Sequence, residues 1–322
     1  MNVIYTVCTY NHIGRALSLA ESVLHHTRAK FIICLIDSIE KNLIPSGHEI
    51  IMAKDMNLSF LNEMCSKYSP LELNSALKPY FGNYIFERYD DVNQVIFLDS
   101  DILLFSDLNP VYEALKSNSI VITPHALSTV PNVSDFDDRD FLRSGIYNAG
   151  FFGLKRDQHT QSFLSWWMMK LRNQGFFDSK RGMFAEQLWM NLIPLYFKNV
   201  HILMHQGCNV AHWNMHERVI SERNGNWYVN EKVPLIFFHY SGATIACFED
   251  NLVSQYQKRY NFTNRPDVYL IFKLYFESLK KHSFEKYNQI YTLNKSLKTQ
   301  SKTVKSIADL YRKIVKKLFY IK

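Results

Sequence analysis

The sequence predicts an α/β fold in which a mixed, mostly parallel sheet is covered by helices on both faces. One observation behind this prediction is that short apolar runs alternate along the chain with longer segments of helical spacing. A second is that these apolar runs end abruptly in polar residues, as buried parallel strands do where they leave a sheet. The chain has 322 residues, of which 47% are apolar, so it can bury a large core.

The predicted elements follow this alternation. Strands are expected at residues 3–9, 31–36, 49–53, 95–98, 120–123 and 234–238. Helices are expected at residues 16–25, 73–89, 109–116, 160–171 and 185–196. Residues 145–154 are expected to turn and re-enter the sheet. Residues 128–143 are polar and rich in aspartate, and we interpret them as a long loop over a cleft.

The amino-acid composition indicates the cellular compartment in which the protein works. The five cysteines are odd in number and show no C-x-x-C spacing, which argues against a disulfide framework or a zinc site and favours a reducing compartment. The first apolar run is too short for a signal peptide and lacks a basic segment before it. No window reaches the roughly 18–20 apolar residues of a membrane span. We therefore expect a cytoplasmic protein.

The net charge of +7 is unevenly distributed. Residues 280–322 hold 12 of the 37 Lys and Arg residues but only two of the 30 Asp and Glu residues, so the rest of the chain is mildly acidic. We expect a main domain over residues 1–250 and a helical C-terminal segment over residues 251–322. Residues 303–322 place apolar side chains at helical spacing with basic ones largely off that stripe, as a helix lying on an anionic membrane does. A helix packed on the main domain is the alternative.

The strongest motif is Asp99-Ser100-Asp101, which directly follows the predicted buried strand 95–98. The carboxyl edge of such a sheet is where ligands bind, and two carboxylates at this spacing can hold one Mg²⁺ or Mn²⁺ ion. A second predicted strand, 234–238, ends in His239, whose imidazole can complete the coordination of a metal held by carboxylates. The alternatives are an Asp-rich turn and a histidine satisfied within the fold.

Further motifs accompany these two. They are, in chain order, the strand and polar turn 3–12, Lys78, Tyr147-Asn148-Ala149-Gly150-Phe151, Glu186-Gln187, and Gly242 three residues after His239. Together with Asp99 and Asp101, their order resembles GT-A glycosyltransferases, and most closely glycosyltransferase family 8 or a sister family, over residues 3–245. Read singly, the Asn-Ala-Gly segment can be a simple turn, Glu186-Gln187 an exposed helical turn, and Lys78 a solvated charge.

The resemblance implies a Rossmann-like GT-A domain that takes a sugar from a nucleotide diphosphate, with a UDP-linked donor and Mn²⁺ or Mg²⁺. The implied metal ligands are Asp99, Asp101 and His239. Donor binding is implied for Thr9 and Asn11 at the base and for Lys78, Ser100, Ala149, Gly150 and Gly242. In the catalytic group, Asn148 and Glu186 would hold sugar hydroxyls and Gln187 would lie beneath the anomeric carbon. The resemblance also implies retention of configuration; an inverting enzyme would need a carboxylate base, such as Glu186 or a loop aspartate.

Two positions depart from the family. Thr9 stands where the family has an acidic residue beside the base, and Ile245 stands where it has a lysine on the diphosphate. The candidates for the missing cation are Lys78, Lys155, Arg218 and Arg223. Residues 205–218 are interpreted as a loop on the acceptor side, where Trp213 either stacks on a sugar ring or packs in the core.

The expected acceptor is a saccharide or a lipid-linked saccharide of surface-glycan biosynthesis, reached at the inner face of the membrane through the basic tail. A nucleic-acid partner is not expected, because the tail has few aromatic residues for base stacking and the main domain is acidic. The sequence also leaves open a sugar nucleotidyltransferase, whose first loop would carry more glycine and basic residues, and an inactive saccharide- or nucleic-acid-binding relative.

Overall fold

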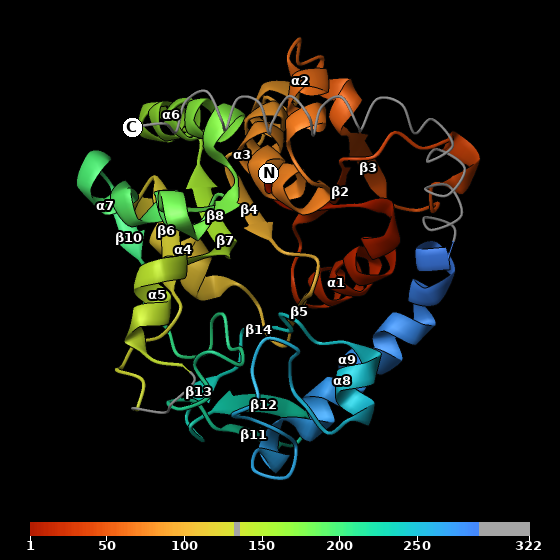
Figure 1. The fold of residues 1–322 in the computed structure, drawn as a ribbon, viewed down its shortest axis with the longest axis vertical. Coiled ribbons are helices and arrows are strands. Elements are labelled where there is room, and N and C mark those ends of the chain that lie inside the picture. Colours follow the sequence, from red (N-terminus) through yellow and green to blue (C-terminus); the bar gives the residue numbers. More distant parts are fainter. Residues whose placement is uncertain (132–135, 290–322) are drawn as a thin grey trace, which may run out of the picture.

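A seven-stranded sheet forms the centre of the molecule, in the order β10-β6-β7-β4-β1-β2-β3 (Figure 1). The computed structural model describes residues 1–131 and 136–289. The strands of this sheet are β1 Asn2–Cys8, β2 Lys30–Leu35, β3 Glu49–Met52, β4 Gln94–Leu98, β6 Ile120–Pro124, β7 Tyr147–Lys155 and β10 Val200–Ile202. Strand β7 is antiparallel to both its neighbours, and the other pairs in the sheet are parallel. The predicted mixed, mostly parallel sheet is confirmed.

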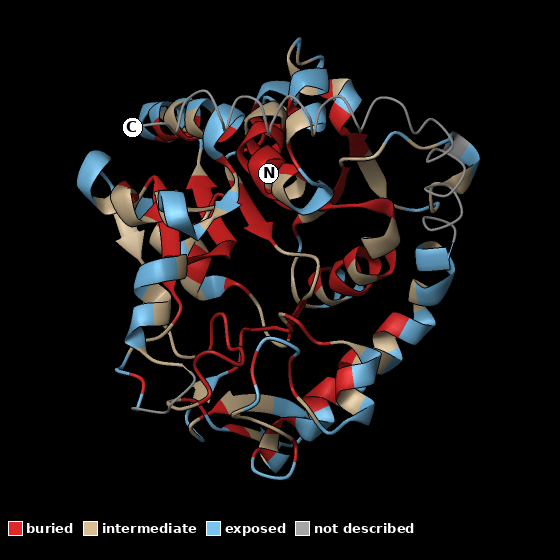
Figure 2. Ribbon diagram, in the orientation of Figure 1, coloured by how far each residue is buried: buried red, intermediate tan, exposed pale blue. Residues whose placement is uncertain are grey.

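Helices cover both faces of this sheet. Helices α1 (Ile13–His26) and α4 (Asn109–Ser117) pack on one face, and α3 (Pro70–Arg88) and α6 (Gln158–Gln174) pack on the other. The shorter helices are α2 Leu61–Lys67, α5 Asp138–Ser144 and α7 Ile193–Tyr196. Figure 2 shows the central strands almost wholly buried, while the surrounding helices alternate between buried and exposed residues. The helical covering expected from the sequence is therefore also confirmed.

Helix α3 runs unusually deep in the protein. It begins with a capping box, in which Ser69 accepts from the backbone of Glu72 while the Glu72 carboxylate accepts from the backbone of Ser69. Residues 75–82 in its middle are all buried, so the helix has no polar face there. Because the helix has no solvent-exposed side at this level, the side chain of Lys78 lies inside the protein and not in solvent.

A second layer packs against the carboxyl edge of the sheet. It contains the antiparallel pair β5 (Ile102–Leu104) and β14 (Phe237–His239), the small sheet β11 (Ile220–Arg223), β12 (Asn226–Val229) and β13 (Val233–Pro234), and the helices α8 (Ile245–Glu249) and α9 (Tyr269–Lys281). Figure 1 shows β11, β12, β13, α8 and α9 gathered on one side of the central sheet. One apolar cluster joins Leu103, Phe238 and Tyr240 to Phe272 and Tyr275 of α9.

Three predicted elements are corrected. Residues 185–196 are not one helix: Ala185 has φ +45°, and a 3₁₀ turn (Leu188–Leu192) precedes the short α7. Glu186 and Gln187 therefore lie in a turn after the hairpin of β8 (Phe177–Asp178) and β9 (Met183–Phe184). The loop 128–143 contains α5, because Asp137 and Asp140 form a capping box that starts a helix. The strand 234–238 is divided between β13 and β14.

The tail at residues 303–322 lies outside the described residues. In the part of the chain that is described, no helix is both long enough and apolar enough to cross a membrane.

Candidate metal and nucleotide-sugar site

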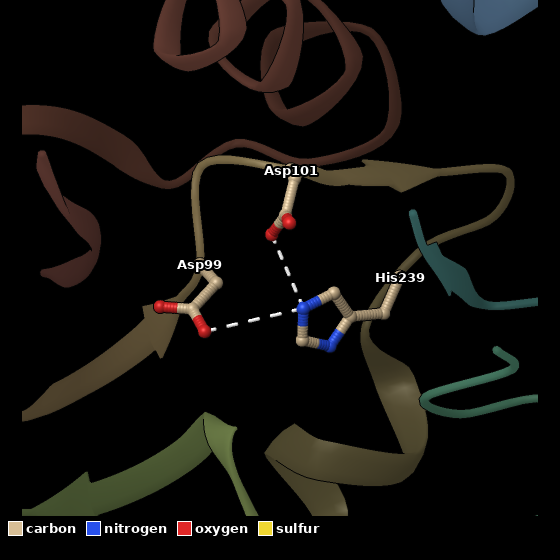
Figure 3. Close-up of side chains that lie close together, drawn as sticks. All are labelled: Asp99, Asp101 and His239. Carbon is tan, nitrogen blue, oxygen red and sulfur yellow. Dashed lines mark ion pairs between the residues drawn. The ribbon is translucent and has the colours of Figure 1, made fainter. Parts of the chain in front are cut away.

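Asp99, Asp101 and His239 converge at the carboxyl end of β4. One possible ligand atom from each of the three lies within 4.8 Å of the others. The Nε2 atom of His239 is 3.1 Å from Oδ1 of Asp101 and 4.0 Å from Oδ2 of Asp99. Figure 3 shows the two carboxylates facing this nitrogen from different sides. The sequence-predicted metal group is therefore assembled in space.

Backbone pairing explains the convergence. Strand β4 ends where the N–H of Asp99 donates to the carbonyl of Gly150 on β7, and the chain then turns into β5. In the antiparallel pair β5–β14, His239 lies opposite Ile102, and the N–H of Tyr240 donates to the carbonyl of Asp101 at 2.8 Å. This register fixes His239 beside the Asp99-Ser100-Asp101 turn although the two segments are far apart in sequence.

Gly150 leaves the space that the group occupies. A Cβ atom at this position would lie 2.4 Å from Cε1 of His239 and 2.9 Å from Oδ2 of Asp99. Separations this short are steric clashes, so only glycine lets β7 pass so close to the two side chains. The third residue of the Asn-Ala-Gly segment thus serves the metal group by lacking a side chain.

The chemistry of this donor set fits a divalent cation. His239 is buried, and its Nδ1 lies 3.2 Å from Oδ1 of Asn209. With a metal ion bound, Nδ1–H would donate to that amide oxygen and leave the Nε2 lone pair for the ion. Two carboxylate oxygens and one imidazole nitrogen are ligands that Mn²⁺ accepts, with Mg²⁺ favouring the oxygens. These three residues would hold the ion.

The two carboxyl groups differ electrostatically. Burial raises the pKa of Asp99, and the Asp101 charge acts in the same direction, against Lys78 and His239. Burial also acts to raise the pKa of Asp101, but His239 and Arg15 outweigh it and hold that pKa well below its usual range. A positive charge between the carboxylates would stabilise the ionised form of both.

Lys78 is a buried cation shared by two acids. Its Nζ lies 2.9 Å from Oδ1 of Asp99 and 2.7 Å from Oε1 of Glu186, and it also donates to the carbonyl of Ala149 at 3.1 Å. Burial disfavours its charge, but the Asp99 and Glu186 carboxylates outweigh that effect and raise the pKa of Lys78. The side chain is only 3% exposed, so its charge serves these two carboxylates and not the solvent.

Gln187 fastens the Asn-Ala-Gly segment. Its Oε1 accepts from the backbone N–H of Ala149 at 3.1 Å and from Nδ2 of Asn148 at 3.3 Å, while its Nε2 donates to the carbonyl of Ser144 at 2.9 Å. The Oδ1 of Asn148 in turn accepts from the N–H of Gly150 at 3.0 Å. The two segments predicted to line the donor sugar are therefore in direct contact.

A cavity of about 850 Å³ opens over this cluster. The predicted site residues that line it are Lys78, Asp99, Ser100, Asp101, Asn148, Glu186, Gln187, His239 and Gly242. The predicted donor-binding residues Thr9, Asn11, Ala149 and Gly150 are not among the residues that line it. Thr9 is buried, with Oγ1 3.5 Å from Nδ1 of His12, and Oδ1 of Asn11 is buried without a hydrogen-bond partner among the described residues.

Other lining residues were not singled out in the sequence. His125 follows β6 just as Asp99 follows β4, so the strand-end rule would have identified it. Its ring stacks on Phe141 and meets Trp213 edge-on, with centroids 5.5 and 5.1 Å apart. His212, Phe136 and Tyr256 extend this aromatic side of the cavity, and no local pattern marks them as neighbours. Trp213 also lines the cavity, within the segment interpreted as the acceptor-side loop.

The basic residues proposed from the sequence as phosphate ligands differ in whether they line the cavity. Lys155 lies at the opposite end of β7, paired with Gln94, and Arg223 lies on the exposed β11–β12 hairpin. Arg218 is buried and donates to the carbonyl of Cys208 at 2.6 Å. None of these three lines the cavity, whereas Lys78 does, together with Arg15 from the first turn of α1.

Comparison with known proteins supports the fold. No known protein-family profile matches the chain. Two proteins of Bacillus subtilis strain 168, the uncharacterized YfnF and YfnD, are each 24% identical to it, over 85% and 86% of this chain and 90% and 88% of their own lengths. A crystal structure of the galactosyltransferase LgtC with donor and acceptor sugar analogs superposes with a TM-score of 0.51 at 14% identity, covering 87% of this chain and 96% of LgtC. The chain has the GT-A glycosyltransferase fold.

Proposed function

We propose that the protein is a divalent-metal-dependent glycosyltransferase that moves a sugar from a nucleoside diphosphate to a saccharide acceptor. The nucleotide that we expect in the donor is UDP. The observation that carries the proposal is the meeting of Asp99, Asp101 and His239 in a cavity at the carboxyl end of β4. The GT-A fold supports it, since LgtC, which shares that fold, is a galactosyltransferase crystallised with donor and acceptor analogs.

The donor set would hold Mn²⁺ or Mg²⁺. When bound, the ion supplies a positive charge that stabilises the departing diphosphate. Around it, the chain's own residues orient the donor: Asn148 and Glu186 line the cavity next to the metal group and present polar atoms to sugar hydroxyls. Gln187 holds Asn148 and Ala149 in place through its two hydrogen bonds to them. Positioning of this kind is a large part of what a transferase must supply.

Retention of configuration belongs to the same proposal. An inverting reaction needs a carboxylate base at the acceptor hydroxyl. Of the described residues that line the cavity, the acidic ones are Asp99, Asp101 and Glu186. The first two face the metal position, and Glu186 is paired with Lys78 at 2.7 Å. Each carboxylate is thus already engaged, which favours retention; the anomeric configuration of the product, read by NMR, tests it.

The first test is calorimetric titration of the protein with UDP, GDP and dTDP, each with and without Mn²⁺. Metal-dependent binding of one nucleotide is expected and names the donor class. Asp101→Ala should lose that binding and all transfer while keeping its fold, because it removes a ligand from a three-residue set. Asp90→Ala, a change at an exposed aspartate outside the cavity, is the matched control. Full activity in Asp101→Ala would remove the metal assignment.

A membrane-linked role is the broader part of the proposal. The basic, amphipathic pattern of residues 303–322 supports recruitment to an anionic cytoplasmic membrane surface, where a lipid-linked acceptor of surface-glycan biosynthesis would be reached. Deleting residues 303–322 should abolish co-sedimentation with vesicles containing anionic lipid and leave nucleotide binding intact. Unchanged vesicle binding by the truncated protein would contradict this part alone.

A further inference from the structure

Arg15 is a cation of the cavity that is only partly engaged by the protein. Among the described residues lining the cavity, the lysine and arginine side chains are Lys78 and Arg15. Lys78 is fully engaged by Asp99, Glu186 and the carbonyl of Ala149. Since a leaving diphosphate carries more negative charge than one divalent ion neutralises, a second cation beside the metal group is of direct chemical interest.

The guanidinium of Arg15 has hydrogen-bond donors to spare. Arginine carries five N–H donors. Here Nη2 donates to the carbonyl of Ala243 at 3.2 Å, and Nε is buried without a partner among the described residues. Nη1 is 3.8 Å from Oδ2 of Asp101, which is an ionic contact too long for a hydrogen bond. Nε is enclosed by protein, but Nη1 and the second hydrogen of Nη2 keep donors for a ligand in the cavity.

The position of Arg15 is fixed by its surroundings. Its Cζ lies 5.4 Å from the ring centroid of Phe284, which follows α9. The preceding residue, Gly14, permits this contact, because a Cβ there would lie 2.6 Å from Cα of Phe284. The side chain is only 15% exposed. Its guanidinium stacks on the Phe284 ring and donates to the carbonyl of Ala243. A cation held in this way is pre-organised for an anion and loses little freedom on binding it.

The loop that Arg15 contacts lies beside the metal group. Ser241, Gly242 and Thr244 line the cavity directly after His239. Gly242 has φ +71°, and a Cβ there would lie 2.5 Å from the Tyr256 ring. Arg15 faces Oδ2 of Asp101, whereas His239 faces Oδ1 of the same carboxylate. An anion bound to a metal on Asp101 would therefore come within reach of the guanidinium.

We propose that Arg15, held on the 241–244 loop and backed by Phe284, binds the diphosphate of the nucleotide donor and takes the place of the lysine that position 245 lacks. The inference rests on the proposed function. It adds Arg15, from the first turn of α1, to the candidate cations drawn from the sequence, of which only Lys78 lines the cavity. The guanidinium fork suits two phosphate oxygens, and its charge offsets that of the leaving group.

The test compares binding of UDP and of uridine in the presence of Mn²⁺ by titration calorimetry, for the wild-type protein, Arg15→Gln and Arg15→Lys. Arg15→Gln should weaken UDP binding about 10- to 100-fold, the range for a lost charge-assisted hydrogen bond, and leave uridine binding unchanged. Arg15→Lys should fall between, because it keeps the charge and loses the fork. Arg223→Gln, at the exposed arginine on the β11–β12 hairpin, should match the wild type.

A second readout separates phosphate binding from support of the metal ligands. Mn²⁺ affinity without nucleotide, measured by electron paramagnetic resonance, should be no weaker in Arg15→Gln, because a cation 3.8 Å from Asp101 repels the metal. Weaker Mn²⁺ binding, an equal loss for uridine and UDP, or unchanged UDP affinity would each overturn the inference. If the wild-type protein binds GDP or dTDP instead, the matching nucleoside replaces uridine. Failure of the wild type to bind any of these nucleotides would overturn the proposed function together with this inference.

Discussion

The cavity has a wall of charged groups and a wall of aromatic rings, and the two are built differently. The charged wall consists of Arg15, Lys78, Asp99, Asp101, Glu186 and His239. The aromatic wall consists of His125, Phe136, Phe141, His212, Trp213 and Tyr256. Trp213 joins the two, since its ring lies 5.1 Å from that of His239 and 5.1 Å from that of His125.

The two walls differ in the charge state of their side chains. On the charged wall, each buried ion has a partner of opposite sign, as Lys78 has in Asp99 and Glu186. On the aromatic wall, burial lowers the pKa of His125 to about 4 and that of His212 to about 3, so both rings are neutral near pH 7. We infer that the charged wall suits the metal and phosphates, while the neutral rings suit the apolar faces of sugars.

The largest effect is expected at Lys78. Lys78→Met leaves the buried Glu186 carboxylate and the partly buried Asp99 carboxylate without their shared cation, which should lower the free energy of unfolding by about 3 to 5 kcal/mol in urea titrations. Adding Glu186→Gln should recover part of that loss by removing one of the two charges. Lys116→Met is the matched control, because Lys116 and its partner Glu113 are 65% and 64% exposed and such pairs contribute little. If Lys78→Met lowers the free energy of unfolding no more than Lys116→Met does, then Asp99 and Glu186 do not depend on Lys78 for their stability in the fold.

The aromatic wall should make stability depend on pH. His125 accepts from Nδ2 of Asn148 through Nε2 and lies 3.2 Å from the carbonyl of Ile146 through Nδ1, so the neutral ring is the one that fits. Its folded-state pKa is below the unfolded value of 6.5. The stability it contributes is therefore present above pH 6.5 and lost as pH falls toward about 4.

The expected loss from His125 is about 3 kcal/mol, taken from the pKa difference at 1.36 kcal/mol per unit. It is measured as the difference between the wild type and His125→Gln in urea titrations from pH 7 to pH 4. His12 and His212 also have lowered pKa values, so the wild type alone does not isolate the effect. Parallel pH curves for the two proteins would refute the assignment to His125.

Gly150→Ala tests the spacing of the charged wall without removing any charge. The new Cβ would clash with Cε1 of His239 and Oδ2 of Asp99, so Mn²⁺ affinity should fall about 10- to 100-fold, the equivalent of overpacking strain. Gly153→Ala, on the same strand, is the control, because its Cβ would meet the end of the Leu115 side chain at 3.2 Å. Equal Mn²⁺ affinity in both variants would mean that the ligands shift freely.

The sequence predicted the charged wall better than the aromatic one, and the reason is physical. Asp99 directly follows a short buried strand and His239 ends one, and each is a local pattern in a single stretch of chain. Lys78 was also named from the sequence and lines the cavity, although its burial between two acids depends on how deep α3 runs. Arg15, which we propose as a phosphate cation, was not among the sequence candidates, because its side chain is placed by the 241–244 loop and by Phe284 near the other end of the chain.

Long-range pairing limited the remaining predictions. That β14 pairs with β5, and not with the central sheet, depends on a register across more than a hundred residues and has no local signature. Residues 185–196 have helical composition, yet Ala185 adopts φ +45° after the β8–β9 hairpin. The aromatic wall gathers residues from several separate segments. Of these, only His125 could have been identified from the sequence as a lining residue, because it directly follows β6.

Trp213 offers the finest test of the division between the walls. The residue is only 6% exposed, Nε1 is buried without a hydrogen-bond partner among the described residues, and the side chain lines the cavity. We expect this N–H to donate to a sugar hydroxyl. Trp213→Phe should lower the transfer rate about 3- to 10-fold, the effect of one hydrogen bond, with UDP affinity unchanged.

The matched control for Trp213 is Trp189→Phe, which removes an indole N–H that donates to the carbonyl of Gln174 and does not line the cavity. That variant should transfer sugar at the wild-type rate. Because Trp213 also contacts the ring of His239, a loss of UDP and Mn²⁺ affinity in Trp213→Phe would place it functionally on the charged wall. A loss confined to transfer, with both affinities intact, would show that the aromatic wall handles the sugar while the charged wall handles the metal and nucleotide.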